Sequence, residues 1–249
     1  MNEQEIAASA ELFAHAHRTG TQFEALPATP ASIAEAHAIQ DLVTMLLGET
    51  VGAFKANTPL NGEPTRATIF SRMVRPSPAR ISRAEAPHLG VEAEIACRFV
   101  CDLPPRSAPY SREEVTDAVV LLPAIEVVSG RLRDPRTRPR LEQLADFMVN
   151  AALIYGEEIH SWSHLAQPNL RLVVAVNDSV ILERCGGHPT GDPVGVATAL
   201  VNLMRGSVGV RAQQIVTTGS WSGLRFLKPG DRCLIQFEDM SPVEVAFEA

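Results

Sequence analysis

The sequence has few cysteines, no excess of basic charge and no long apolar run, and each shortage excludes a class of protein. Four cysteines in 249 residues are too few to staple the chain, so we expect reduced thiols that pack as small apolar side chains. The 22 basic and 29 acidic residues give a net charge of −7, which argues against binding to nucleic acid or anionic lipid. No apolar stretch approaches the roughly 20 residues that cross a bilayer, and the acidic N-terminus is unlike a signal peptide. We expect a cytoplasmic protein with no membrane or nucleic-acid partner.

The spacing of apolar residues predicts helices near the N-terminus and mainly strands beyond it. Predicted helices cover 3–18, 32–48, 112–119, 141–155 and 193–205. Predicted strands cover 91–100, 121–129, 171–177, 179–184, 214–218, 232–238 and 243–248. Capping boxes at Ser32–Glu35 and Ser111–Glu114, and Asp192 before Pro193, support three of the helix starts.

This pattern indicates an α+β, mostly-β fold, because the strands do not alternate regularly with helices. We divide the chain into a helical region over 1–70 and a longer, strand-rich region over 71–249. The two are expected to form one integrated domain.

Three glutamates stand where a strand would ordinarily carry apolar residues. Glu92 and Glu94 alternate within a predicted strand and therefore share a face, and Glu126 lies inside an apolar strand. A buried carboxylate without a partner costs several kcal/mol. A hard divalent cation such as Mg²⁺ or Mn²⁺ would neutralise the three, since both accept oxygen ligands. The alternatives are that Arg98 or Arg131 pairs with these acids, or that Glu92 and Glu94 face solvent on an edge strand.

Other motifs give weaker signals. No Gly-x-Ser-x-Gly elbow or cysteine–histidine pairing indicates a covalent acyl enzyme. His160 and His164 have helical ligand spacing, but their segment is typical of a surface loop. The glycine-rich segment 186–192 lacks a phosphate-loop lysine and is interpreted as a loop that caps a helix. The three glutamates are therefore the strongest chemical signal.

Several motifs in a fixed order resemble one family. Glu92-Ala-Glu94 and Pro123-Ala-Ile-Glu126 are accompanied by Val51–Lys55, Gly191-Asp-Pro193 and Ile215–Ser220. This set resembles the bacterial 2-keto-4-pentenoate hydratase and 4-oxalocrotonate decarboxylase family, within the fumarylacetoacetate hydrolase superfamily. The resemblance implies a mixed β-roll with the N-terminal helices packed outside it, and a homo-oligomer.

The resemblance also implies a site. Glu92, Glu94 and Glu126 would hold the divalent metal, Mg²⁺ or Mn²⁺, and the metal would chelate a small 2-oxo or 2-hydroxydienoate substrate. Chelation makes the 2-oxo group a better electron sink and stabilises an enolate. An enolate is common to hydration, vinylogous decarboxylation and C–C hydrolysis.

Further residues are assigned from the same resemblance. Lys55 would donate a proton or anchor a carboxylate, and Gly219 and Ser220 would approach the substrate. Asp146 is a candidate catalytic acid, with a role as a helix-surface or capping acid as its alternative. Arg66 is a candidate for binding a second, distal carboxylate.

The chain departs from the family at four positions. Ala56-Asn57 follows Lys55 where a small apolar residue and glycine are usual, and Thr65 stands near the place where many hydratases carry an acid. Phe147 follows Asp146 where asparagine is common. These departures remove a proton shuttle or reshape the site, so they bear directly on the reaction.

The function expected from the sequence is hydration of a 2-hydroxy-2,4-dienoate to a 4-hydroxy-2-oxoacid by a metal-dependent lyase. The alternative reaction is decarboxylation of a 2-oxo-enedioate, which Arg66 would favour. A second alternative is a catalytically weakened homologue that acts as a binding or assembly protein. C–C hydrolysis of an acylpyruvate would need an additional water-activating base.

Overall fold

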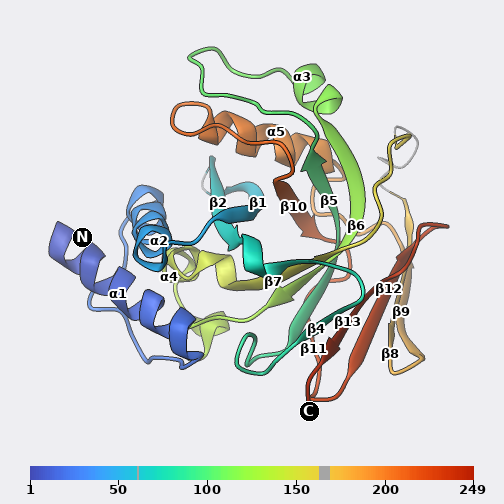
Figure 1. Ribbon diagram of the computed structural model, residues 1–249, viewed down its shortest axis with the longest axis horizontal. Coiled ribbons are helices and arrows are strands. Elements are labelled where there is room, and N and C mark those ends of the chain that lie inside the picture. Colours follow the sequence, from blue (N-terminus) through green and yellow to red (C-terminus); the bar gives the residue numbers. More distant parts are fainter. Residues whose placement is uncertain (61, 163–168) are drawn as a thin grey trace.

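Two β-sheets form the body of the molecule, and helices lie around the larger one (Figure 1). The computed structural model describes residues 1–60, 62–162 and 169–249. The α-helices are α1 Glu3–Thr19, α2 Ile33–Leu47, α3 Arg112–Asp117, α4 Arg140–Ala145 and α5 Pro193–Met204. Three 3₁₀ turns are η1 Ser71–Met73, η2 Pro135–Thr137 and η3 Phe147–Val149.

The larger, eight-stranded sheet is mixed and has the order β2-β1-β10-β5-β6-β7-β3, with β11 paired to β5. Its strands are β1 Val51–Leu60, β2 Glu63–Phe70, β3 Val74–Pro76, β5 Gly90–Phe99, β6 Val119–Val128, β7 Asn150–Tyr155, β10 Ile215–Ser220 and β11 Arg225–Phe226. The sheet curls until β7 approaches β2, where the Asn150 amide donates to the Thr68 carbonyl at 3.1 Å. The fold class predicted from the sequence is confirmed: this is a mixed β-roll with helices at its N-terminal end.

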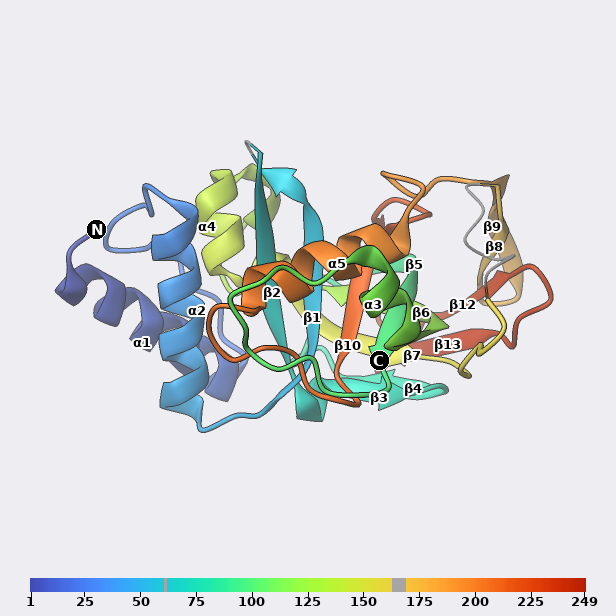
Figure 2. The same cartoon turned by 90° about the horizontal axis from the view of Figure 1, so that it is seen from above.

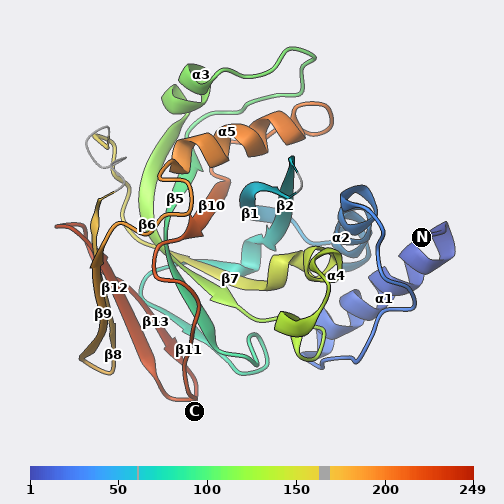
Figure 3. The ribbon, with the colours of Figure 1, turned by 180° about the vertical axis from the view of Figure 1, so that it is seen from behind.

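The smaller sheet has five strands in the order β4-β13-β12-β8-β9. These are β4 Ala79–Ile81, β13 Val243–Phe247, β12 Arg232–Phe237, β8 Arg171–Val176 and β9 Ser179–Cys185. In the view from behind, this sheet and helices α1 and α2 lie at opposite ends of the molecule (Figure 3). The larger sheet therefore occupies the middle, and its strands position the site described below.

The helices cover the larger sheet in two ways. Helix α5 crosses strands β1, β2 and β10, as the view from above shows (Figure 2). Helix α2 lies along the edge of β2, where the Gln40 side chain donates to the Arg66 carbonyl and accepts the Thr68 N–H, each at 3.2 Å. This pairing satisfies backbone groups that an edge strand would otherwise expose. In the described part of the chain, no helix has the length and apolar character needed to span a membrane.

The predicted helix starts agree with the structure. Ser111 and Glu114 form a complete capping box at the start of α3, and Ser32 accepts the Glu35 N–H at the start of α2. Asp192 accepts the Gly195 N–H at the start of α5. These local signals were readable because each depends on residues within one turn of chain.

The predicted helix over 141–155 is wrong beyond its first turn. Helix α4 ends at Ala145, and Phe147, Met148 and Val149 have positive φ values of 54°, 51° and 62°. The chain then enters strand β7, which pairs with β6 on one side and β3 on the other. A short apolar run such as 150–155 fits a buried strand as well as a helix, so its periodicity could not decide between them.

The sequence also missed the strands that precede β5. Residues 51–70, which we assigned to the helical region, form the hairpin of β1 and β2 at one edge of the larger sheet. The helical region ends at Leu47. Strands β3 and β4 are short and were not predicted either. The loop predicted around His160 is described only in part, because His164 lies outside the described residues.

Candidate metal centre

Strand register brings the three glutamates together. Glu92 of β5 pairs directly with Glu126 of β6, and Glu94 lies two residues further along β5 on the same face. One ligand oxygen of each glutamate lies within 4.8 Å of the other two. The alternation in β5 was readable from the sequence, whereas the pairing of Glu92 with Glu126 is a property of the sheet.

Lys55 reaches this cluster from β1. Its partner in β10 is Thr217, which in turn pairs with Ala96 of β5, so the register places all three on the face that carries the glutamates. The Lys55 Nζ lies 2.7 Å from Glu126 Oε1 and 3.6 Å from Glu92 Oε2. The structure therefore brings together four of the residues that the sequence singled out.

Glu94 is held by the backbone of β10. Its Oε2 accepts the N–H groups of Thr218 at 2.8 Å and Gly219 at 2.9 Å. These two donors converge because β10 carries a bulge between Thr217 and Ser220, and Gly219 has a φ of 126°, which glycine adopts readily. Glu94 Oε1 is buried and has no hydrogen-bond partner in the described part of the chain. One carboxylate oxygen is thus fixed and the other remains available.

The cluster carries more negative charge than Lys55 alone can neutralise. Burial raises the pKa of Glu94 and of Glu126, and the neighbouring carboxylates raise both further, while Lys55 opposes them. Burial lowers the pKa of Lys55, but the three glutamates outweigh it and hold that pKa above its ordinary value. When ionised, three carboxylates and one ammonium group carry a net charge of −2.

The donor set fits a hard divalent cation. Mg²⁺ takes oxygen ligands at about 2.1 Å, which places neighbouring ligand oxygens about 3 Å apart and opposite ones about 4 Å apart. The ligand oxygens of the three carboxylates lie within 4.8 Å of one another, so small side-chain movements would bring them to that spacing, and Glu94 Oε1 is the buried acceptor that such an ion would satisfy. A divalent charge also matches the charge of the cluster. Glu92, Glu94 and Glu126 are therefore the residues that could hold the metal.

The two alternatives that the sequence left open do not hold. Strand β5 lies between β10 and β6, so it is not an edge strand. Arg98 pairs with Glu158 at 2.5 Å, and Arg131 pairs with Asp146 at 3.0 Å. Within the described ranges, neither arginine neutralises the glutamate cluster.

Of the four remaining predicted site residues, Gly219 and Ser220 lie beside the cluster, whereas Arg66 and Asp146 do not. Ser220 pairs with Glu94 across the bulge, and its Oγ is buried with no hydrogen-bond partner among the described residues. Gly219 contributes its N–H to Glu94. Arg66 pairs in register with Ala56, which puts it on the face of β2 opposite to Lys55, and its guanidinium binds Asp41 at 2.6 Å. The structure does not bring Arg66 to the glutamates.

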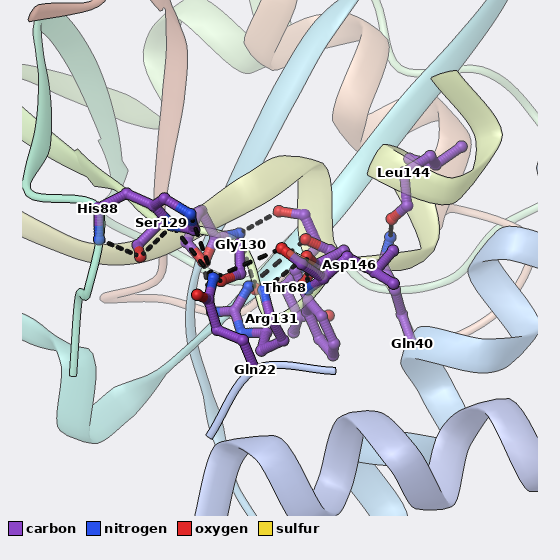
Figure 4. Close-up of polar contacts among 12 residues, drawn as sticks. Gln22, Gln40, Thr68, His88, Ser129, Gly130, Arg131, Leu144 and Asp146 are labelled. Atoms are coloured by element: carbon purple, nitrogen blue, oxygen red, sulfur yellow. Dashed lines mark hydrogen bonds and ion pairs between the residues drawn. The ribbon is translucent and has the colours of Figure 1, made fainter. Parts of the chain in front are cut away.

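Asp146 braces the chain after β6. Its carboxylate accepts the N–H groups of Arg131 at 2.7 Å and Leu132 at 3.1 Å, and it pairs with the Arg131 guanidinium (Figure 4). Burial raises the pKa of Asp146, and Arg131 and these N–H donors oppose that rise. The end of α4 brings Asp146 to the Arg131 guanidinium. These contacts favour a bracing role for Asp146 over a catalytic one.

Asp146→Asn should therefore destabilise the protein. The single amide oxygen could not accept from both the backbone donors of Arg131 and Leu132 and the Arg131 guanidinium, and the largely buried guanidinium would lose its counter-ion. We expect the free energy of unfolding to fall by about 3–5 kcal/mol, measured by urea denaturation. Mn²⁺ affinity of the folded variant should stay within about threefold of the original, since Asp146 makes none of the contacts of the glutamate cluster. A variant of unchanged stability would contradict the bracing role.

Sequence reasoning missed one residue that supports the cluster. His188 lies in the segment 186–192, which we interpreted only as a helix-capping loop, yet its Nε2 lies 2.9 Å from the Thr218 carbonyl. The contact joins residues 30 positions apart, so a local sequence pattern could not predict it.

Comparisons with known proteins agree with the fold. The family model described as "Fumarylacetoacetate (FAA) hydrolase C-terminal" matches residues 48–247. No curated protein matched the sequence. The solved structure of 4-oxalocrotonate decarboxylase from Pseudomonas putida G7, complexed with magnesium and adipate, has a TM-score of 0.83 at 18% identity and covers 99% of this chain and 98% of its own.

Two further solved structures are similar over less of the chain. Fumarylpyruvate hydrolase from Pseudomonas aeruginosa, in complex with Mn²⁺ and pyruvate, has a TM-score of 0.56 at 11% identity and covers 79% of this chain and 88% of its own. The 2-hydroxyhepta-2,4-diene-1,7-dioate isomerase from Mycobacterium marinum has a TM-score of 0.55 at 16% identity and covers 80% of this chain and 76% of its own. At these identities the likeness establishes the fold and not the reaction.

Proposed function

The chain belongs to the fumarylacetoacetate hydrolase family, and on this premise we propose that it is a divalent-metal-dependent lyase. Its substrate would be a small 2-oxo or 2-hydroxydienoate, of the kind formed when aromatic rings are degraded. The reaction is hydration of a 2-hydroxy-2,4-dienoate to a 4-hydroxy-2-oxoacid. Homo-oligomerisation stays a prediction.

The observation that carries this proposal is the cluster of Glu92, Glu94 and Glu126, two of them fully buried, with Lys55 against it. Mg²⁺ or Mn²⁺ bound by the three glutamates would withdraw electron density from the 2-oxo acid end of the substrate and stabilise negative charge along its conjugated chain. The carboxylates around Lys55 keep its ammonium group charged and hold its pKa above the ordinary value, which by itself opposes proton donation. A divalent cation bound by the same glutamates would weaken that hold, and Lys55 could then donate a proton or anchor a carboxylate of the substrate. The buried Ser220 hydroxyl supplies a hydrogen bond to a polar group of the substrate.

The position of Arg66 favours hydration over decarboxylation. A 2-oxo-enedioate carries a second carboxylate, and Arg66 was the residue expected to bind it. That guanidinium binds Asp41 and belongs to the opposite face of the sheet. Hydration needs a proton donor and a water molecule in addition to the bound metal, and so requires fewer further groups.

Decarboxylation is the second candidate because of the likeness to 4-oxalocrotonate decarboxylase. That similarity extends over 99% of this chain, whereas the isomerase and the hydrolase cover 80% and 79% of it. The likeness thus includes the N-terminal helices. It supports membership of the hydratase and decarboxylase branch without choosing between the two reactions.

Mass spectrometry of the product tests the proposal. Incubation with Mg²⁺ and a 2-hydroxy-2,4-dienoate should yield a product heavier by one water, and chelation of the metal should stop the reaction. Incubation with a 2-oxo-enedioate is the parallel assay, in which loss of carbon dioxide would favour the second candidate. Binding of these acids without turnover would overturn both and favour the binding-protein alternative.

A further inference from the structure

The peptide group between Thr218 and Gly219 is held from both sides. On one side its N–H, from Gly219, donates to Glu94 Oε2 at 2.9 Å. On the other side its carbonyl, from Thr218, accepts a hydrogen bond from His188 Nε2 at 2.9 Å. A donor to the carbonyl of a peptide polarises its N–H, so the two hydrogen bonds strengthen each other. One peptide therefore links His188 to a glutamate of the cluster.

The hydrogen bonds of His188 define its protonation. The Thr218 carbonyl can only accept, so Nε2 carries the hydrogen, and Nδ1 accepts the Thr190 N–H at 3.3 Å. Both ring nitrogens are thereby engaged in a neutral imidazole. Burial lowers the pKa of His188, which favours the same neutral form. The imidazole is fixed in one orientation with its donor toward the peptide.

The segment 186–192 is seated firmly against the end of β10. Gly187 has a φ of 129°, and a Cβ atom there would lie 2.5 Å from the Trp221 carbonyl oxygen, so the two backbones touch. The His188 ring packs on Trp221 with centroids 5.5 Å apart, and Trp221 packs on Phe237 of the smaller sheet at the same distance. The position of His188 is thus fixed by the core between the two sheets.

The bulge that carries this peptide needs such support. Gly219 has a φ of 126° and no side chain to restrict its backbone, so the peptide before it can rotate at low cost. A rotated peptide would turn the Thr218 carbonyl toward Glu94 and set two acceptors against each other. Glu94 Oε2 would lose a donor, and Oε1 would lose its fixed direction.

We propose that His188 is a positioning residue for the metal centre: it locks the Thr218–Gly219 peptide, which holds Glu94 Oε2 and so leaves Oε1 for the cation. This inference rests on the proposed function only in taking the cation to be a divalent metal. Groups that orient a metal ligand in this way typically change metal affinity 10–100-fold when they are removed.

Two amide substitutions test the proposal as a matched pair. His188→Gln places an amide donor near the position of Nε2, whereas His188→Asn places it near Nδ1 and loses the bond to Thr218. Mn²⁺ titration of each purified, folded variant, alongside the unsubstituted protein, should give a dissociation constant raised about tenfold or more for His188→Asn and less than about threefold for His188→Gln. Thermal melting without metal reports any general loss of packing, which should be similar for both.

The outcomes separate this proposal from the proposed function. Failure of the unsubstituted protein to bind Mn²⁺ would overturn both. Binding by the unsubstituted protein with equal Mn²⁺ affinity for the two variants would overturn the role of His188 alone. A further check uses Glu94→Gln: in that background, adding His188→Asn should change the residual Mn²⁺ affinity by less than about twofold, because the peptide no longer positions a ligand. A tenfold loss in that background would also overturn the proposal.

Discussion

Glu126→Gln should reduce metal-dependent turnover by about a thousandfold or more, equivalent to about 4 kcal/mol of transition-state stabilisation. Glu126 is fully buried, lies opposite Glu92 and forms the shortest contact with Lys55. The substitution removes one of the three charged ligands and puts an amide beside the Lys55 ammonium. Mn²⁺ titration and steady-state kinetics at saturating Mg²⁺ measure the two effects.

Glu142→Gln is the matched control for this variant. Glu142 is also a buried glutamate, but its Oε1 accepts a hydrogen bond from Thr29 near the N-terminal helices. Turnover and Mn²⁺ affinity should stay within about twofold of the original, and circular dichroism should show that both variants are folded. The metal assignment is lost if Glu126→Gln keeps both its turnover and its Mn²⁺ affinity.

Lys55→Met should separate metal binding from chemistry. The ammonium group lies among the same carboxylates that would hold the metal, so its removal takes away a competing cation. Mn²⁺ affinity should therefore be retained or increased. Turnover should fall by about 10²–10⁴-fold, the usual effect of losing a proton donor. Isothermal titration gives the affinity, and single-turnover kinetics give the chemical step.

The melting temperature of Lys55→Met provides a second test. Without metal, the two buried carboxylates and the partly buried Glu92 lose their cation, so the melting temperature should fall, and adding Mn²⁺ should restore it. Lys228→Met is the control, because Lys228 is the other lysine of the chain and is exposed. Unchanged turnover in Lys55→Met would remove Lys55 from the mechanism, and complete loss of Mn²⁺ binding would mean that it serves the metal site instead.

Local patterns indicated the glutamates of the candidate site but missed several of the strands around them. The shared face of Glu92 and Glu94 follows from strand alternation, and the burial of Glu126 follows from the apolar run on both sides of it. The same reasoning failed at 141–155, where a six-residue apolar run became β7 because β6 and β3 flank it. It also failed for β1 and β2, whose hairpin is defined by pairing within a curled sheet.

The structure shows where Thr65 and Phe147, two of the positions at which this chain departs from the family pattern, lie. Thr65 pairs in register with Asn57, so it belongs to the sheet face that carries Lys55 and presents a hydroxyl there rather than an acid. Phe147 is buried against His17 of α1 and Phe70 of β2. Its bulk is therefore used in packing α1 against the sheet.

By itself, the sequence determined which residues share a strand face, where helices α2, α3 and α5 begin, and which family the chain resembles. Each of these depends on short stretches of sequence, because strand alternation and helix capping involve residues close together in the chain. Only the tertiary structure decided that Lys55 meets Glu126, that Asp146 pairs with Arg131 and that His188 holds the peptide behind Glu94. These contacts join segments far apart in the chain, and their geometry is fixed by sheet register and by the packing of loops against it.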